Sequence, residues 1–441
     1  MQTVDSLIHA RWVVPIIPRE RLLENHSVVI DKGRIVDILP TLEVMGRYQA
    51  NHESHLDEHV LLPGFINAHT HAAMSLLRGI ADDLPLKTWL EKHIWPLERQ
   101  WALDDFVYDG TRLAIAEMLK SGTTCFADMY FFPEAAAEAV HESGIRARLG
   151  TVIIEFPTRY AETVDEYFSK GLALADEHKH DPLISVQFAP HAPYTVSDEQ
   201  LKRIQMLSTE LGRPVHMHVH ETAHEVEEAM GKDGMRPLER LNKLGMLSPD
   251  FQAVHMTELS EEDIKLISDT GVHVIHCPES NMKLASGACP VSELLKAGVN
   301  VALGTDGAAS NNDLDMLGEL KTAALLGKLV ARDASALSAW QALEMATING
   351  AKALQLDDKI GTIERGKQAD LQAIHLGQLE QQPLFHPVSQ IVYASQRQQI
   401  SDVWVAGKHL MKDRKLTTLK ESELIANAYE WQKKLSKPIK D

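Results

Sequence analysis

The sequence predicts a (β/α)8 barrel of the TIM type with a small β-sandwich domain formed by the N- and C-terminal segments. Three observations predict this fold. Eight short apolar runs alternate with helical patterns between residues 61 and 305, glycines mark most of the junctions, and both chain ends carry short strand patterns. We therefore expect a barrel over residues 61–366 and a composite β domain, including a C-terminal helix, over residues 1–60 plus 367–441.

The two ends of the chain carry the patterns of the small β domain. Near the N-terminus, Asp31-Lys32-Gly33 separates the apolar runs Ser27–Ile30 and Ile35–Ile38, which is typical of a hairpin turn between two strands. The C-terminal part has similar strand patterns, followed by one helical pattern. These segments are Asp370–His375, Gln390–Tyr393 and Val403–Val405 as strands, and Glu421–Leu435 as a helix.

The middle of the chain repeats one unit, in which a helical pattern ends in glycine and a strand pattern follows. Glycine just past a helix end takes the left-handed conformation, so each such junction indicates a helix stop and a strand start. An open doubly wound sheet is the alternative, but no Gly-x-Gly-x-x-Gly motif follows an early strand. The eight expected strands are Leu61–Ala68, Thr123–Ala127, Ile145–Ile153, Ile184–Ala189, Pro214–His220, Gln252–His255, Val272–Cys277 and Val299–Gly304.

Composition excludes several classes of function. With 44 Lys and Arg against 62 Asp and Glu, the net charge is −18, which disfavours binding to nucleic acids or anionic membranes. The three cysteines are widely spaced and form no disulfide framework. No apolar run reaches the roughly 18 residues of a membrane span, and no signal peptide is evident, so the cytoplasm is the expected location. The 22 histidines instead favour catalytic metal chemistry with nitrogen and oxygen ligands.

Several histidines and one aspartate fall at the ends of the predicted strands. His69 and His71 end the first strand on one face, His218 lies in the fifth, and His255 ends the sixth. Asp306 follows the eighth strand. Active sites of such barrels lie at the carboxyl ends of the strands, so joint placement there predicts a metal site. Each residue alone also fits an ordinary buried side chain or a turn, and the neighbouring His216 and His220 could pack or support the ligands.

The order of these motifs resembles the deaminase and chlorohydrolase branch of the amidohydrolase superfamily over nearly the whole chain. This resemblance implies that His69, His71, His218 and Asp306 bind the metal, that His255 lies beside the reacting water, and that Glu221 carries protons. The segment Ser185–His191 lacks the lysine of binuclear members, which implies a single metal ion. The matching motifs are Leu62–His71, His218–Glu221, His255, His276–Asn281 and Gly304–Gly307.

The segment Ala72–Leu90 is similar to the 5′-methylthioadenosine/S-adenosylhomocysteine deaminase family. This similarity implies that Trp89 packs against a nucleoside, that Glu98 accepts hydrogen bonds from ribose hydroxyls, and that His191 contacts the substrate. Taken alone, Trp89 is more typical of a core and Glu98 of a solvated helix face. By a looser match, Arg146 or Arg148 could bind a homocysteine carboxylate.

The expected reaction is hydrolytic deamination of an adenine ring at C6. Water activated by one divalent ion per subunit attacks C6, Asp306 and His255 orient the water, and Glu221 protonates the ring nitrogen. Zinc is the expected ion, with iron and manganese as alternatives. Methylthioadenosine or S-adenosylhomocysteine is the expected substrate, adenosine is possible, and a homo-oligomer is expected. The alternatives are an aminohydrolase of guanine, cytosine or a triazine, a triazine hydrolase that displaces chloride or an alkylamine, and an inactive scaffold.

Overall fold

The computed structural model describes residues 1–437, and its larger sheet contains eight parallel strands in the order of the sequence. All eight predicted strands are present, so the predicted barrel topology is confirmed. These strands are β5 (Phe65–Thr70), β6 (Thr123–Tyr130), β7 (Arg146–Ile153), β8 (Ile184–Pro190), β9 (Val215–Val219), β10 (Phe251–His255), β11 (His273–His276) and β12 (Val301–Leu303).

The first and last strands of this sheet meet and close the barrel. The Asn67 side chain accepts a hydrogen bond from the Thr305 backbone N–H and donates one to the Thr305 hydroxyl. The Asp306 N–H donates to the His69 carbonyl at 3.0 Å. A Cβ atom at Gly304 would lie 2.7 Å from the His69 nitrogen, so only glycine allows this approach.

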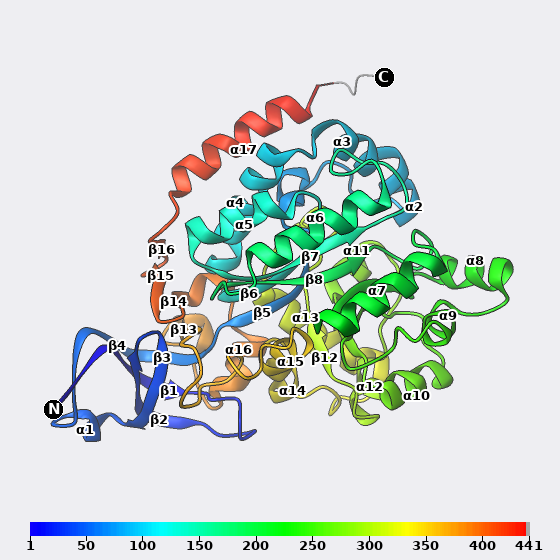
Figure 1. Ribbon diagram of the computed structural model, residues 1–441. Helices are drawn as coiled ribbons and strands as arrows, with labels where there is room; N and C mark the ends of the chain where they lie inside the picture. Colours follow the sequence, from blue (N-terminus) through cyan, green and yellow to red (C-terminus); the bar gives the residue numbers. More distant parts are fainter. Residues whose placement is uncertain (438–441) are drawn as a thin grey trace.

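Helices follow the barrel strands and surround the sheet (Figure 1). Their apolar faces and the outer faces of the strands form one large buried core. The helices of this part are α2 (Leu86–Trp89), α3 (Trp95–Trp101), α4 (Asp104–Lys120), α5 (Pro133–Ser143), α6 (Val164–Glu177), α7 (Asp198–Leu211), α8 (Ala223–Asp233), α9 (Pro237–Lys243), α10 (Glu261–Thr270), α11 (Pro278–Lys283), α12 (Val291–Lys296), α13 (Met316–Ala331), α14 (Ala339–Met345) and α15 (Ile348–Ala353), with a short 3₁₀ helix at Ala72–Leu77 and a π-helical segment at Leu90–Ile94.

Both ends of the chain form the second sheet, in the order β16-β15-β14-β13-β4-β1-β2-β3, as predicted for the composite β domain. Its own apolar cluster includes Ile8, Val28, Leu371 and Trp404. The elements are β1 (Gln2–Val13), β2 (Leu23–Asp31), β3 (Arg34–Pro40), α1 (Thr41–Val44), β4 (Tyr48–Pro63), β13 (Leu371–His375), β14 (Ile400–Val405), β15 (Lys408–Lys412) and β16 (Lys415–Leu416).

Two predicted strands differ from the structure. Leu61–Pro63 ends β4 and pairs with β13, so only the later part of the predicted strand Leu61–Ala68 belongs to the barrel. Gln390–Tyr393 is not a strand but the end of helix α16 (Pro387–Tyr393). An apolar run of four residues fits either structure, whereas buried Val388, Ile391 and Val392 have helical spacing. The domain boundaries themselves stay a prediction.

The C-terminal helix α17 (Glu421–Leu435) has the predicted bounds and lies along α4 of the barrel (Figure 1). The Trp431 ring packs edge-on against Phe106 and Trp101, and its Nε1 donates to Asp109 Oδ2 at 2.8 Å. Short turns at Leu379–Gln381 and Arg397–Gln399 complete the elements. Within residues 1–437, no helix is both long and apolar enough to span a bilayer.

Candidate active site

Four side chains from three strand ends converge at the carboxyl end of the barrel. His69 Nε2 and His71 Nε2 lie 3.3 and 3.2 Å from Asp306 Oδ1. His218 Nε2 lies 3.2 Å from His69 Nε2. All four side chains are buried or nearly so. The structure therefore brings together the four residues predicted as metal ligands.

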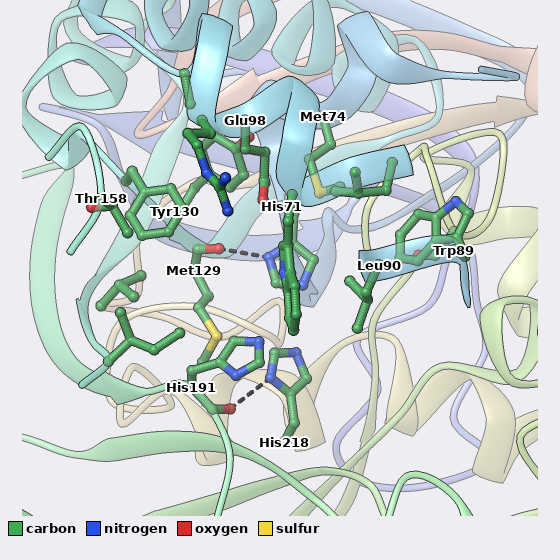
Figure 2. Close-up of a pocket in the computed structure, with 18 of the residues that line it drawn as sticks. His71, Met74, Trp89, Leu90, Glu98, Met129, Tyr130, Thr158, His191 and His218 are labelled. Atoms are coloured by element: carbon green, nitrogen blue, oxygen red, sulfur yellow. Dashed lines mark hydrogen bonds between the residues drawn. The ribbon is translucent and has the colours of Figure 1, made fainter. Parts of the chain in front are cut away.

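The far side of two of these imidazoles is fixed by backbone carbonyls. His71 Nδ1 donates to the Met129 carbonyl at 2.6 Å, and His218 Nδ1 donates to the His191 carbonyl at 2.7 Å (Figure 2). A carbonyl oxygen can only accept, so both rings carry their proton on Nδ1 when neutral. Each Nε2 then presents a lone pair to the centre of the cluster, as a metal ligand must.

A chain of buried side chains fixes the third imidazole in the same way. Gln252 Nε2 donates to the Ala353 carbonyl, so Gln252 Oε1 faces His216 and accepts from its Nδ1 at 2.7 Å. His216 Nε2 therefore accepts from His69 Nδ1, 2.8 Å away, and His69 Nε2 keeps a lone pair. His216 thus supports His69. In contrast, His220 holds the backbone of Glu258 and Leu238, outside the cluster.

Three further hydrogen-bond donors orient the Asp306 carboxylate. Ser280 and Ser310 donate to Oδ2, each at 2.7 Å, and the Gly307 N–H donates to Oδ1. Burial raises the pKa of Asp306, but hydrogen bonds from His69 and His71, formed when a proton rather than a metal ion occupies Nε2, have a stronger effect and hold this pKa well below its usual value. Three imidazole nitrogens and one ionised carboxylate fit a divalent transition-metal ion with space left for water.

Glu221 and His255 lie beside this cluster. His255 Nε2 is 3.8 Å from Glu221 Oε1, and His255 Nδ1 is hydrogen-bonded to Asn281 Oδ1 at 2.8 Å. Burial raises the pKa of Glu221 above its usual value. The Glu225 carboxylate accepts the N–H groups of Glu221 and of the residue before it, which fixes the start of this loop. His255 and Asp306 have φ of 75° and 65°, conformations that non-glycine residues keep where the surroundings impose them.

A pocket of about 1210 Å³ of empty volume, including its open mouth, lies over the cluster. Figure 2 shows Trp89 and Leu90 on one side of His71, with Tyr130 and Thr158 on the other and Glu98 near His71. Burial raises the pKa of Glu98 to about 7. His191 lies next to His218, and burial lowers its pKa to about 4, so its ring is neutral at pH 7. The structure thus places Trp89, Glu98 and His191 in one pocket.

Arg146 and Arg148 do not line this pocket. Arg146 begins β7, at the opposite end of the barrel, and its guanidinium binds both carboxylate oxygens of Asp370 at 2.8 and 3.2 Å. Arg148 is buried further along the same strand, and burial lowers its pKa to about 10. Neither guanidinium can therefore reach a substrate in the pocket without a large rearrangement.

Several pocket residues were not predicted from the sequence. Arg99 and Arg159 carry the guanidinium groups at this pocket, and the Arg159 Nε donates to the Arg99 carbonyl. The sequence offers only one general indication, which is that loops after barrel strands line the site. It does not indicate which loop residues turn inward. The other unpredicted residues include Met74, Tyr130, Phe156, Thr158 and Tyr194.

Comparison with known proteins places the chain in a family. Residues 60–410, well over half of the chain, match the amidohydrolase family. The chain belongs to the amidohydrolase family. This amidohydrolase is 54% identical over 433 residues to the 5-methylthioadenosine/S-adenosylhomocysteine deaminase of Teredinibacter turnerae, an alignment that covers 98% of both chains. It is 42% identical over 420 residues to the 5′-deoxyadenosine deaminase of Methanopyrus kandleri, covering 95% of this chain and 96% of the relative.

A solved structure gives the same result for the fold. The crystal structure of an adenosine deaminase from Xanthomonas campestris with bound zinc matches this amidohydrolase with a TM-score of 0.97 and 50% identity. The match covers 98% of this chain and 99% of the other. The predicted barrel and the predicted resemblance to deaminases of this family are therefore confirmed.

Proposed function

We propose that this amidohydrolase is a zinc-dependent deaminase that removes the 6-amino group of adenine nucleosides, with 5′-methylthioadenosine or S-adenosylhomocysteine as preferred substrates. The observation that carries the proposal is the convergence of His69, His71, His218 and Asp306 beside Glu221, at the base of a pocket that also contains Trp89. Relatives that share 54% and 42% identity are named deaminases of such nucleosides. A bound zinc ion in the similar adenosine deaminase structure supports zinc.

The four-residue cluster would hold the ion, and the neighbouring Glu221 and His255 orient the water and transfer protons. His69, His71, His218 and Asp306 would hold a divalent ion, which would lower the pKa of water towards about 7 and so make a nucleophile available at neutral pH. His255, held by Asn281, presents Nε2 towards Glu221 and orients the water together with Asp306. Because burial raises its pKa, Glu221 holds a proton more readily than an exposed carboxyl and can deliver it to the ring nitrogen as C6 is attacked.

The walls of the pocket recognise the rest of the nucleoside. Trp89 is buried to 5% exposure but borders the pocket, so one face of its indole can pack against the substrate. Glu98 offers carboxylate oxygens to the ribose hydroxyls. His191, whose ring is uncharged at pH 7, can form a hydrogen bond with the base. Arg159 lines the pocket and Arg146 and Arg148 do not, which supports Arg159 as the contact for a carboxylate on a 5′ substituent.

A substrate panel tests this proposal. Ammonia release would be measured for methylthioadenosine, S-adenosylhomocysteine, 5′-deoxyadenosine and adenosine, with guanine, cytosine and an amino-triazine as alternatives, and zinc would be measured on the same sample. We expect the adenine nucleosides to react, with the highest kcat/KM for the 5′-thio compounds. Preference for another ring would reassign the substrate class, and zinc-loaded protein without any turnover would indicate an inactive scaffold.

Replacement of Glu221 by Gln tests the proton carrier. The Glu221→Gln variant keeps the shape of the side chain and leaves all four metal ligands in place. We expect it to retain its zinc and to lose about 10²–10⁴-fold in kcat, because an amide cannot donate a carboxyl proton. Steady-state kinetics together with metal analysis check this result, and unchanged kcat would remove Glu221 from the mechanism.

A further inference from the structure

A second group of potential metal ligands lies at the opposite end of the barrel. His141 is in the last turn of α5, His178 directly follows α6, and Asp181 lies in the loop before β8. The group His69, His71, His218 and Asp306, called the catalytic cluster below, lies beyond the other end of the strands. Since β8 has seven residues, the two ends are roughly 20 Å apart. This second group, His141, His178 and Asp181, is called the lower cluster below.

The ligand atoms of the lower cluster converge on one carboxylate oxygen. Asp181 Oδ2 lies 2.7 Å from His141 Nε2 and 3.7 Å from His178 Nδ1. All three ligand atoms lie within 4.8 Å of one another. The two imidazole rings are 5.5 Å apart and inclined by 51°, so their ring planes cross rather than stack. Nitrogens in crossing planes can point at one common ion.

The carboxylate of the lower cluster is held in place by the fold. Asp181 Oδ1 accepts the N–H groups of Leu183 and Ile184 at 2.7 and 2.8 Å, which leaves Oδ2 for the histidines. Burial raises the pKa of Asp181, but these two hydrogen bonds and the one from His141 have a stronger effect and lower the pKa below its usual value. The carboxyl group is therefore ionised at neutral pH. His178 is also fixed, with 8% of its side chain exposed, whereas His141 is 48% exposed.

The charges around the lower cluster permit a cation. The guanidinium of Arg146 on the neighbouring strand interacts with the charge of Asp181, but it donates to the Pro182 carbonyl and is paired with Asp370. The arrangement repeats that of the catalytic cluster, where one oxygen of Asp306 faces two imidazole nitrogens and the carboxylate is held by other donors. An ion pair alone would account for the contact of His141. It would leave His178 Nδ1 outside hydrogen-bond distance of Asp181.

We propose that His141, His178 and Asp181 bind a second divalent transition-metal ion, with water in the remaining positions. Two imidazoles and a carboxylate select zinc and similar ions over magnesium or calcium, which prefer oxygen ligands alone. Ligands of a tetrahedral zinc ion lie about 3.3 Å apart, so small side-chain movements suffice to close this site. The ion joins the ends of α5 and α6 to the start of β8, and it takes no part in the reaction.

Zinc content measures this second site directly. Full-length protein would be saturated with zinc, freed from loose metal by gel filtration, and analysed for zinc per subunit. We expect two zinc ions in the wild type and one in His141→Ala, because loss of one of three protein ligands weakens binding at least about 10-fold. The exposed neighbour His180 lies outside the lower cluster, so His180→Ala is the matched control and should keep two. Asp181 is avoided because its carboxylate also holds the backbone of β8.

The same variants separate this site from the catalytic one. His141→Ala should keep its rate of ammonia release, since the lower cluster is far from the pocket. Equal zinc content in the wild type and His141→Ala would overturn the proposal and leave an ion pair only. A crystal grown from the zinc-saturated protein adds an independent measurement: an anomalous zinc peak between the three side chains supports the site, and its absence there excludes it.

Discussion

At the scale of single residues, Glu98 is a carboxylate whose surroundings set its response to pH. Burial raises its pKa to about 7. If the ionised carboxylate accepts hydrogen bonds from the ribose, binding is strongest above pH 7 and weakens below it. We therefore expect kcat/KM, which reports the free enzyme, to fall below pH 7 by up to about tenfold per pH unit. A pH profile of kcat/KM with adenosine measures this effect.

Two controls assign that pH dependence to Glu98. Glu98→Gln cannot change its charge, so it should have a lower plateau and lose the decline near pH 7. 2′,3′-Dideoxyadenosine lacks the ribose hydroxyls and should react slowly without that decline. If the decline persists in both experiments, another group, such as Glu221, causes it and the role of Glu98 is wrong.

The residues of the site differ in how far the sequence could predict them. His69, His71, His218 and Asp306 were predictable because strand ends of a barrel meet at one face, so the topology fixes their neighbours. Arg159 was not, because a loop residue turns into a pocket through contacts that its own segment does not encode. His216 lies between these cases. Its strand position indicated a place near His69, but nothing in the sequence indicated its hydrogen bond to Gln252.

At the scale of elements, Arg146 joins the two sheets of the molecule. It lies at the start of β7, and Asp370 immediately precedes β13 of the composite sheet. Both side chains are nearly inaccessible, with 3% and 2% exposed. Arg146→Met leaves a buried carboxylate unpaired, so we expect the free energy of unfolding to fall by about 3–5 kcal/mol. Urea denaturation measures this loss.

Arg159→Met is the matched comparison, because Arg159 is exposed at the pocket. Its stability should change by less than about 0.5 kcal/mol. Its KM for S-adenosylhomocysteine should rise, while its KM for methylthioadenosine, which has no carboxylate, should not. The opposite pattern, with a stable Arg146→Met that binds S-adenosylhomocysteine poorly, would return the carboxylate contact to Arg146.

The elements themselves were predictable where a regular period or a capping residue marked them. The bounds of α17 followed from its amphipathic pattern, and the hairpin at Asp31-Lys32-Gly33 followed from its turn residues. The division of Leu61–Ala68 between two sheets was not visible, because both parts are apolar and buried. The division falls at Gly64, and only the structure shows why glycine is needed there: a Cβ atom would lie 2.1 Å from the Thr124 side chain.

At the scale of the whole molecule, the four proposed metal ligands connect distant parts of the barrel sheet. His69 belongs to β5, Asp306 follows β12, and His218 lies in β9. An ion bound there therefore links the first and last strands of the barrel, which close it, to a third strand of the same sheet. Metal binding should therefore stabilise the complete fold. At a free metal concentration of about 1,000 times Kd, the stabilisation is about 4 kcal/mol.

This stabilisation should depend on pH in a defined direction. Without metal, burial lowers the pKa of His71, but the hydrogen bond and charge of Asp306 raise it more strongly, to about 9. A raised folded pKa adds stability that is complete below the unfolded value of about 6.5 and is lost as the pH rises through 9. In the metal-bound protein, the ion takes the place of that proton, so this loss does not occur. The difference in melting temperature between metal-loaded and chelator-treated protein should therefore widen between pH 6.5 and 9.

Thermal melts at several pH values, with and without chelator, measure this difference. The experiment is best done with His141→Ala, so that the chelator removes metal from the catalytic cluster alone. Glu221→Gln keeps all four ligands and should show the same widening, whereas His71→Ala, which lacks both the ligand and the proton, should show none. A difference that is constant or narrows as the pH rises would mean that the proton on His71 does not compete with the metal.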